Sequence, residues 1–274
     1  MPTLDGVYRF LLTRRWLAFH LLVLLLIPAF FFLGKWQFGR FEERSASSER
    51  TTANLNSAPV PLDRLDTVGG TVSSDVKFRP VTVTGKYDAS HELLVRRRPQ
   101  NSRVGFYVVT PLVTPQGAVL VNRGWVPAGA TAETRPEVPP PPSGEVTVTG
   151  RLKPSETEDT TGIRNRSAGL PTGQVLLVNT TDIGATLPYR LYGGFVELTG
   201  QRPTADRAPE PVPAPDLGGG GGLNLAYSVQ WWLFIGVAVG GWFLLIRREA
   251  RDLSAADAEG DGAGKDQEEV RAQS

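Results

Sequence analysis

Hydrophobic positions are concentrated in two long runs, one near each end of the chain. Residues 16–33 read WLAFHLLVLLLIPAFFFL, and residues 225–246 read LAYSVQWWLFIGVAVGGWFLLI. At about 1.5 Å per helical residue the runs extend about 27 and about 33 Å, close to the apolar core of a bilayer. The pattern predicts transmembrane helices over residues 16–34 and 225–246. The first run ends in FFFLGK, a poor signal-peptide cleavage site, so we interpret it as a retained anchor.

The charges that flank the second run predict the topology. Arg247, Arg248 and Arg251 follow it directly, whereas residues 209–224 contain no Lys or Arg. Positively charged flanks stay in the cytoplasm, so the C-terminus is expected there, and two spans put the N-terminal residues 1–15 on the same side. The sequence therefore predicts a multi-pass protein of the cell membrane with residues 35–224 outside the cytoplasm.

Between the anchors, short segments show strand signals, and residues 79–87 alternate Val and Thr with the period of two that β-strands show. The candidate strands cover residues 79–87, 91–98, 105–113, 118–126, 145–152, 174–179 and 194–199. Together with short helices near 61–68 and 181–187, they predict a mainly β domain, an antiparallel β-barrel or sandwich. The pentapeptide VTVTG occurs at 81–85 and again at 146–150, either by chance or because two equivalent strands end at the same glycine bend.

Four polar segments show neither pattern. Residues 45–59 are expected to form a linker, and residues 155–173 a long loop. Residues 201–222 are rich first in Pro and then in Gly, which predicts a flexible tether to the second helix. Residues 247–274 are charged and poor in apolar side chains, which predicts a disordered cytoplasmic tail.

Composition excludes several classes of function. The 274 residues carry a net charge of +1, which offers no electrostatic footprint for nucleic acid. The absence of Cys excludes a CxxC redox pair, a thiolate metal site and an iron–sulfur cluster. No phosphate-binding loop, HExxH or dinucleotide motif occurs, so we predict no enzyme, no catalytic residue and no metal site. Of the two imidazoles, His20 is either an interfacial residue or a haem or metal ligand, and His91 is a surface residue.

The two apolar runs carry polar and aromatic groups at what would be the outer leaflet. One set, the exit cluster, follows the first run: Trp36, Gln37 and Arg40. The other, the outer stripe, shares one face in the outer half of the second helix: Asn224, Tyr227, Gln230 and Trp231. Either both sets anchor the helices at the interface, or they meet in one site for a ligand or a partner subunit. Gly236 and Gly240 lie on the opposite face as a GxxxG pair, which predicts packing against the first helix.

One stretch of the central domain also combines unusual side chains. It places a cation, a bend and a large ring at the end of a strand: Asn122, Arg123, Gly124 and Trp125. Either an arginine stacks on the tryptophan inside the fold, or the four residues form a docking surface for a partner.

Several motifs, in this order, resemble the Surfeit locus protein 1 family of cytochrome oxidase assembly factors in its bacterial, actinobacterial-like form. Residues 33–40, LGKWQFGR, look like the family's LGxWQxxR, and residues 85–87 resemble its GxY/F. Residues 121–127, VNRGWVP, and residues 227–231, YSVQW, match two further family motifs. The resemblance extends from about residue 16 to about residue 246.

The resemblance implies a non-enzymatic assembly factor or chaperone for the haem–copper cytochrome c oxidase of the respiratory chain. It implies action at or near the insertion of haem a into the catalytic subunit. That subunit, haem a synthase and membrane lipid are the implied partners, and haem a is an implied transient cofactor. The alternative is an envelope scaffold or a ligand-binding β domain unrelated to respiration.

The resemblance also bears on the outer stripe. Some family members are reported to bind haem through a His just before the Tyr of the second helix, and this chain has Asn224 there. Asn is a poor ligand for haem iron, which speaks against direct ligation. The exit cluster and the outer stripe together remain the candidates for a haem or subunit site.

Overall fold

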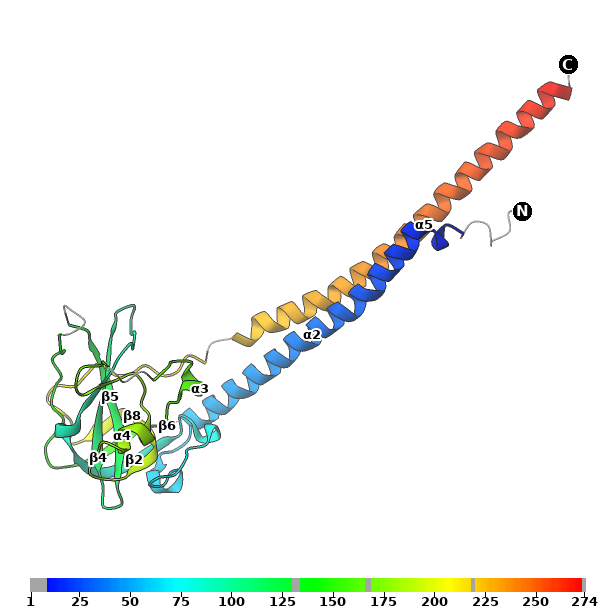
Figure 1. The fold of residues 1–274 in the computed structure, drawn as a ribbon. Coiled ribbons are helices and arrows are strands. Elements are labelled where there is room, and N and C mark those ends of the chain that lie inside the picture. Colours follow the sequence, from blue (N-terminus) through cyan, green and yellow to red (C-terminus); the bar gives the residue numbers. More distant parts are fainter. Residues whose placement is uncertain (1–8, 130–133, 166–168, 218–219, 273–274) are drawn as a thin grey trace. The chain divides into compact units, whose positions relative to one another are not determined.

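The chain folds into two compact units, one made of two long helices and one made mainly of β-strands (Figure 1). The helical unit consists of residues 1–46 and 218–274, and the barrel unit of residues 47–217. The computed structural model describes residues 9–129, 134–165, 169–217 and 220–272. The division differs from the predicted one, because residues 35–46 belong to the helical unit.

The helical unit contains α5 (Gly220–Ala272) and all but the last residues of α2 (Arg14–Leu55), with the 3₁₀ turn η1 (Arg9–Leu12) before α2. Each helix contains a stretch that is long and apolar enough to cross a membrane, judged by length and composition. The hydrophobic runs of the sequence predicted both helices. Along the chain, the two apolar helices flank the β-rich unit.

The first helix is longer than predicted, since residues 45–55 are helical where we expected a linker. Hydroxyl groups satisfy backbone carbonyls one turn earlier, as when Thr51 Oγ1 donates to the Ser47 carbonyl at 2.9 Å. Residues 47–55 belong to the barrel unit, and other residues of that unit hold them in place. Asn54 Nδ2 donates to the carbonyls of Asp75 and Lys77 at 2.7 and 3.0 Å. Tertiary contacts therefore extend a segment whose own composition is neutral towards helix.

The second helix also continues past its apolar part, to Ala272, where we predicted a disordered tail. Ala, Glu, Gln, Lys and Arg dominate this segment and are good helix formers. Arg248 and Asp252, one turn apart, face each other at 3.8 Å. Low apolar content, on which the prediction rested, does not by itself prevent helix formation.

Five strands close into a barrel: β2 (Pro80–Tyr87), β4 (Gly105–Val113), β5 (Ala118–Pro127), β6 (Glu145–Pro154) and β8 (Leu191–Arg202). They pair in the order β2–β6–β8–β5–β4, and β2 pairs with β4 to complete the ring. The sheet is extended by three short strands: β1 (Val60–Pro61), β3 (Leu93–Val95) and β7 (Gln174–Val175). The five-stranded ring has the connectivity of an OB-fold barrel.

The structure decides between barrel and sandwich, and it corrects the expectation of a wholly antiparallel sheet. β5 and β8 pair in parallel, with Leu120 opposite Phe195 and Asn122 opposite Glu197. The pairs β1–β2 and β3–β7 are parallel as well. Alternation along a strand marks which residues face the core but not which strands become neighbours, so it could not reveal these pairings.

The interior of the barrel is filled by apolar side chains from every strand of the ring. Each strand contributes a fully buried residue to one cluster: Val81, Leu112, Val121, Val148 and Val196. The ring is therefore a packed core and not an open channel.

The repeated VTVTG segments are neighbours that pair with each other. In the antiparallel ladder between β2 and β6, Val83 lies opposite Val148, and each glycine, Gly85 and Gly150, lies opposite a valine of the other copy. A Cβ on Gly85 would lie 2.4 Å from the Val113 carbonyl oxygen, and one on Gly150 would lie 2.3 Å from that of Glu197. The two copies are thus equivalent strands, each with a glycine where a third strand approaches.

The shorter elements depart from the predictions mainly in length. The expected helix at 61–68 is only the 3₁₀ turn η2 (Leu62–Arg64), and the expected strand at 174–179 forms ladder pairs only in β7. The expected helix at 181–187 is α4 (Thr180–Gly184), capped by the Asn179 side chain. The long loop 155–173 contains α3 (Glu158–Thr161). The remaining turns are η3 (Ser74–Val76) and η4 (Ala89–His91).

The first part of the predicted tether is bound to the barrel. Glu210 exchanges two backbone hydrogen bonds with Trp125, at 2.7 and 2.8 Å. Gln100 Nε2 donates to the Pro211 carbonyl at 3.1 Å, and Arg151 Nη2 donates to that of Val212 at 2.9 Å. Residues 210–213 therefore form a strap along the barrel unit, because side chains of the barrel satisfy its carbonyl groups.

Candidate functional site

The two helices of the helical unit run antiparallel, since residues early in α2 contact residues late in α5. The ring of His20 lies against that of Trp242, at a centroid distance of 5.7 Å. Further along α2, Phe30 packs on Trp231 at 5.5 Å. This direction puts the exit cluster level with the outer stripe, as a single site built from both helices requires.

A glycine allows α2 and α5 to approach closely at this level. Gly34 is buried, and a Cβ on it would lie 2.3 Å from Nε1 of Trp232. Only glycine leaves room for the indole there. On α5, Ser228 is fully buried, and its hydroxyl has no hydrogen-bond partner among the described residues. Our reading of the sequence missed Gly34, although a glycine directly before the exit cluster was a signal for helix contact.

The predicted packing glycines lie elsewhere. A Cβ on Gly236 or on Gly240 would meet nothing within 4 Å, so neither residue packs against α2 in this structure. The assignment of these two glycines to helix packing is therefore corrected. The GxxxG spacing permits a close contact but does not fix which face of α5 meets its neighbour, and the aromatic residues Trp231 and Trp242 direct the other face towards α2.

The seven candidate residues differ in exposure. Trp36 is 59% exposed and Tyr227 is 49% exposed, and Arg40 and Gln230 are exposed as well. Gln37, Asn224 and Trp231 are half-buried. Trp231 belongs to the contact between the helices, whereas Trp36 and Tyr227 present large rings that α2 and α5 leave uncovered.

The histidine of the first helix has a structural partner. Trp242 Nε1 donates a hydrogen bond to Nδ1 of His20 at 2.8 Å, and the ring of Trp16 lies 5.8 Å from that of His20. Because Nδ1 accepts this bond, the neutral imidazole carries its proton on Nε2. In that tautomer Nε2 carries a proton and the Nδ1 lone pair accepts the bond from Trp242, which speaks against the alternative of a haem or metal ligand.

In the barrel unit, the stretch considered as a docking surface is buried: Asn122, Arg123, Gly124 and Trp125. This corrects the docking interpretation, because a buried side chain offers nothing to a partner. Arg123 donates to Glu92 Oε2 at 2.9 Å and to the Pro139 carbonyl at 2.7 Å. It thereby links β5 to two loops of its own unit.

Trp125 is fully enclosed by its own unit, as the intramolecular alternative proposed. Its Nε1 donates to the Arg98 carbonyl at 2.6 Å, and the guanidinium of Arg103 lies 4.8 Å from the ring centre. The stacking arginine is thus Arg103, not the adjacent Arg123. Gly124 has a φ of 139° and faces the strap, where the Glu210 carbonyl would lie 2.5 Å from an added Cβ.

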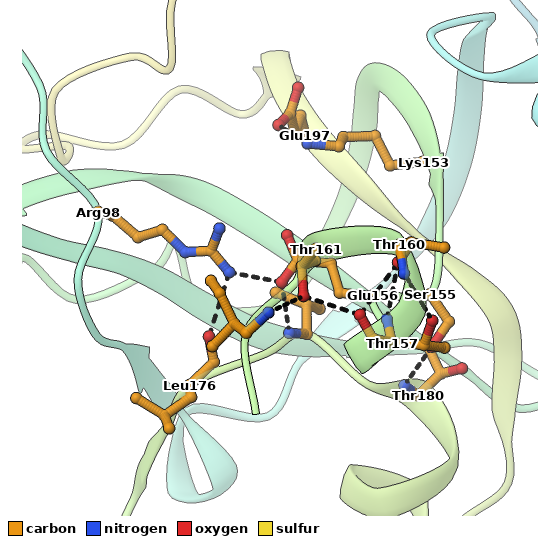
Figure 2. A network of polar contacts seen from close by, with 12 residues as sticks. Arg98, Lys153, Ser155, Glu156, Thr157, Thr160, Thr161, Leu176, Thr180 and Glu197 are labelled. Atoms are coloured by element: carbon orange, nitrogen blue, oxygen red, sulfur yellow. Dashed lines mark hydrogen bonds and ion pairs between the residues drawn. The ribbon is translucent and has the colours of Figure 1, made fainter. Parts of the chain in front are cut away.

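A second group of charges is centred on Glu156, a half-buried residue just after β6 (Figure 2). Its carboxylate pairs with Arg98 and accepts the backbone N–H of Val178 at 2.9 Å. Arg98 also donates to the Leu176 carbonyl at 3.3 Å. Figure 2 shows these side chains converging from separate segments of the chain. The arrangement ties the β7 region to β6 through a half-buried carboxylate whose charge Arg98 neutralises.

Glu197 on β8 forms ion pairs with two cationic side chains. It is 3% exposed and accepts from Lys153 Nζ at 2.9 Å, with Arg151 Nε at 3.4 Å on the other oxygen. Burial, and then the nearby charge of Lys153, lower the pKa of Lys77. Cations thus gather around two acidic residues, and each carboxylate has a specific partner.

The other histidine belongs to a small polar cluster on the barrel unit. Asp88 Oδ2 accepts from His91 Nδ1 at 2.7 Å and from the Tyr189 hydroxyl at 2.9 Å, and Oδ1 accepts from the Ser90 hydroxyl. Burial opposes ionisation of Asp88, but the hydrogen bonds from Ser90, His91 and Tyr189 outweigh it and lower the pKa of Asp88 to about 2. The cluster fixes His91 in place at the start of β3.

These arrangements give the two units different chemical capacities. Among the described residues, no group of three or more His, Asp or Glu side chains could hold a metal ion. The charged networks of the barrel unit are directed at other parts of that unit. The exposed rings of Trp36 and Tyr227 on the helical unit are the groups that a partner or an apolar ligand could cover.

The protein is thus of the class in which two long apolar helices flank a closed β-barrel. Residues 24–236 match the model of the SURF1 family, a stretch that begins within α2 and ends within α5. The chain belongs to the SURF1 family.

Similar proteins come from bacteria and eukaryotes. An uncharacterized SURF1-like protein of Mycobacterium tuberculosis is 31% identical over 226 residues, covering 81% of this chain and 80% of the relative. Surfeit locus protein 1 of Xenopus tropicalis is 32% identical over 154 residues, 49% of this chain and 48% of the relative. The cytochrome oxidase assembly protein SHY1 of Saccharomyces cerevisiae is 29% identical over 98 residues, 35% of this chain and 25% of the relative. These similarities agree with the resemblance recognised from the motifs.

Proposed function

We propose that the protein is a membrane-anchored, non-enzymatic assembly factor for cytochrome c oxidase. The observation that carries this proposal is the family match over residues 24–236, which includes part of each apolar helix and the whole barrel unit. The name of the yeast relative, a cytochrome oxidase assembly protein, supplies the process. The proposal gives the haem–copper oxidase, through its catalytic subunit, as the partner, with haem a synthase as a second.

In this proposal α2 and α5 span the cell membrane, with both termini in the cytoplasm and the barrel unit outside. The length and composition of the two helices support insertion. The arginines that follow the apolar part of α5, including Arg247 and Arg251, support a cytoplasmic C-terminus. The exit cluster and the outer stripe then lie at the outer leaflet.

The working part is the outer end of the helical unit, where the exposed rings of Trp36 and Tyr227 meet a helix of the catalytic subunit or haem a. Two uncovered aromatic rings at one level of a helix pair support this role, because aromatic side chains are frequent anchors of protein interfaces. The protein acts near the insertion of haem a. It does so without ligating the iron through Asn224, since an amide is a poor iron ligand.

The proposal is tested in a strain that lacks the gene, by measuring oxidase activity and the haem a absorbance of isolated membranes. Loss of both, restored by the intact gene, is expected. The variants Trp36→Ala and Tyr227→Ala should restore them poorly, whereas Leu24→Ala, which truncates an exposed side chain remote from the exit cluster, should restore them fully. Normal oxidase in the deletion strain would overturn the proposal.

A second measurement separates assembly from haem carriage. The intact protein is purified from membranes that make haem a, and its absorbance spectrum is recorded. Absence of haem a would remove carriage and leave assembly intact. A haem a spectrum that survives Asn224→Ala and disappears in Trp36→Ala would support binding by the aromatic site rather than by an axial ligand.

A further inference from the structure

A cavity of about 590 Å³ lies between α2 and α5 at the end of the helical unit opposite the exit cluster. Its volume is in the range of small-molecule sites in proteins. Both helices line it, from Arg15 to Leu22 on α2 and from Leu245 to Asp252 on α5. The cavity therefore depends on the helix pair and is not a feature of either helix alone.

The lining changes from charged to apolar along the helices. At one end stand Arg15 and Arg248, one from each helix, and at the other Leu22 and Leu245. Seven residues of helix separate Arg15 from Leu22, a rise of about 10 Å. The His20–Trp242 hydrogen bond joins the helices next to the apolar end. A ligand that fills this cavity needs a polar end and an apolar end about 10 Å apart.

The charge at the polar end favours an anion. Residues 14–15 and 247–252 carry five arginines and two carboxylates. Arg15 has no ion pair or hydrogen bond with any other described residue, and Arg248 has only a long contact with Asp252, 3.8 Å, on its own helix. The carboxylates of Glu249 and Asp252 also line the cavity. The excess of arginine nevertheless leaves guanidinium groups available for a phosphate.

We propose that this cavity binds one anionic phospholipid, such as phosphatidylglycerol, from the cytoplasmic leaflet. The phosphodiester lies between Arg15 and Arg248, and an acyl chain follows Phe19 and Leu22 into the apolar part. Basic pockets between membrane helices on the cytoplasmic side are suited to such headgroups. The inference rests on the proposed membrane insertion of α2 and α5, but not on the proposed role in oxidase assembly.

Trp16 provides a direct readout, because its ring lines the cavity. The full chain is placed in lipid nanodiscs of phosphatidylcholine that contain brominated phosphatidylglycerol as a minor component, and quenching of tryptophan fluorescence is measured. The Trp16→Phe variant, measured in the same way, isolates the signal of this residue from the other five tryptophans. We expect half-maximal quenching of Trp16 at a much lower content of brominated phosphatidylglycerol than of brominated phosphatidylcholine. Equal quenching by both lipids would mean ordinary contact with the bilayer and would overturn the proposal.

Two double variants that remove the same charge distinguish binding at a specific site from general electrostatic attraction of anionic lipid. Arg15→Gln with Arg248→Gln removes the two arginines that line the cavity and should weaken quenching by brominated phosphatidylglycerol about tenfold. Arg14→Gln with Arg247→Gln removes the same charge from adjacent positions that do not line it, and should change quenching less than about twofold. Equal losses in both variants would overturn the proposal.

A third variant tests the cavity without changing charge. Ala18→Phe places a ring in the lining and should reduce the preference for brominated phosphatidylglycerol, whereas persistence of full preference would contradict a site in the cavity. Helix content from circular dichroism checks that each variant remains folded. Oxidase activity of the same variants is recorded separately, so that loss of lipid preference and loss of assembly are distinguishable outcomes.

Discussion

The barrel unit and the helical unit use their unusual side chains in opposite ways. In the barrel unit, Arg123 and Trp125 are buried, Glu156 is half-buried, and all three are bound to other parts of the same unit. In the helical unit, large rings such as Trp36 and Tyr227 remain uncovered. A motif in the barrel therefore acts through stability, whereas a motif on the helices is available to something outside the chain. The same residue type, tryptophan, has both roles within one protein.

The largest effect on stability is expected for Trp125→Ala in the barrel unit. Truncation of a fully buried tryptophan leaves a cavity and removes its hydrogen bond to the Arg98 carbonyl, a loss of about 4 kcal/mol. Thermal unfolding of the full chain in detergent measures it. Val104→Ala, at a side chain 69% exposed, is the control and should change stability by less than about 0.5 kcal/mol. Similar stabilities for both variants would contradict the enclosed role of Trp125.

A somewhat smaller loss is expected for Glu156→Gln. The change leaves the half-buried Arg98 without its anionic partner and weakens the bond from the Val178 amide, at a cost of about 2 kcal/mol. Glu137→Gln is the matched control, because its pair with Arg207 is exposed on both sides. Chemical unfolding of the two variants, measured at one pH, gives the difference. Equal stability would show that the network of Figure 2 does not hold the unit together.

The helix contact is tested by Gly34→Leu, for which about 2 kcal/mol of overpacking is expected at Trp232. Disulfide formation between cysteines introduced at Phe30 and Phe234, whose rings are 5.8 Å apart, reports the helix pairing. Its yield should fall several-fold. Gly236→Leu, where a Cβ meets nothing within 4 Å, should leave the yield unchanged. If Gly236→Leu lowered the disulfide yield and Gly34→Leu did not, the packing face of α5 would be the one that carries Gly236 and Gly240.

A pH-dependent effect of about 1 kcal/mol is expected at Asp88. Its pKa is lowered in the folded protein, so the stability that it contributes is present above the unfolded value of 3.8 and is lost as the pH falls towards about 2. Asp88→Asn should therefore destabilise the chain at pH 7 and make little difference near pH 2. A loss that is the same at both pH values would assign the effect to packing instead of charge.

The smallest effect on stability, below about 0.5 kcal/mol, is expected for Trp36→Ala, because this ring is 59% exposed. Its expected effect is on oxidase maturation in the complemented deletion strain. Unchanged maturation together with unchanged stability would remove Trp36 from the proposed site. A large loss of stability would show that Trp36 is needed for folding, and would contradict the contrast between the exposed rings of the helical unit and the buried side chains of the barrel unit.

Much of the barrel could be predicted because its signal is local. The alternation of Val and Thr in residues 81–85 and 146–150 marked two strands, and these two strands are partners in the sheet. The parallel pairing of β5 with β8 could not be predicted, since it depends on which distant strands become neighbours. The strap was missed for a similar reason, because its carbonyls are satisfied by side chains about 60 to 110 residues away in sequence.

The candidate site was predicted in composition but not in orientation. Helical periodicity identified the residues of the outer stripe, and the structure places Tyr227 exposed and Asn224 half-buried. Helical periodicity could not predict which face of α5 meets α2. That choice depends on Gly34 and Trp232 fitting together, which no pattern within one helix encodes.

By itself, the sequence determined the two apolar helices, the strand-rich middle and the family, because hydrophobic length, period and ordered motifs are properties of the chain read locally. The tertiary structure alone decided the closed ring, the burial of Arg123 and Trp125, and the face on which the helices meet. Those outcomes depend on close packing and on charges being paired where they are buried, and both require partners that only the folded chain brings together.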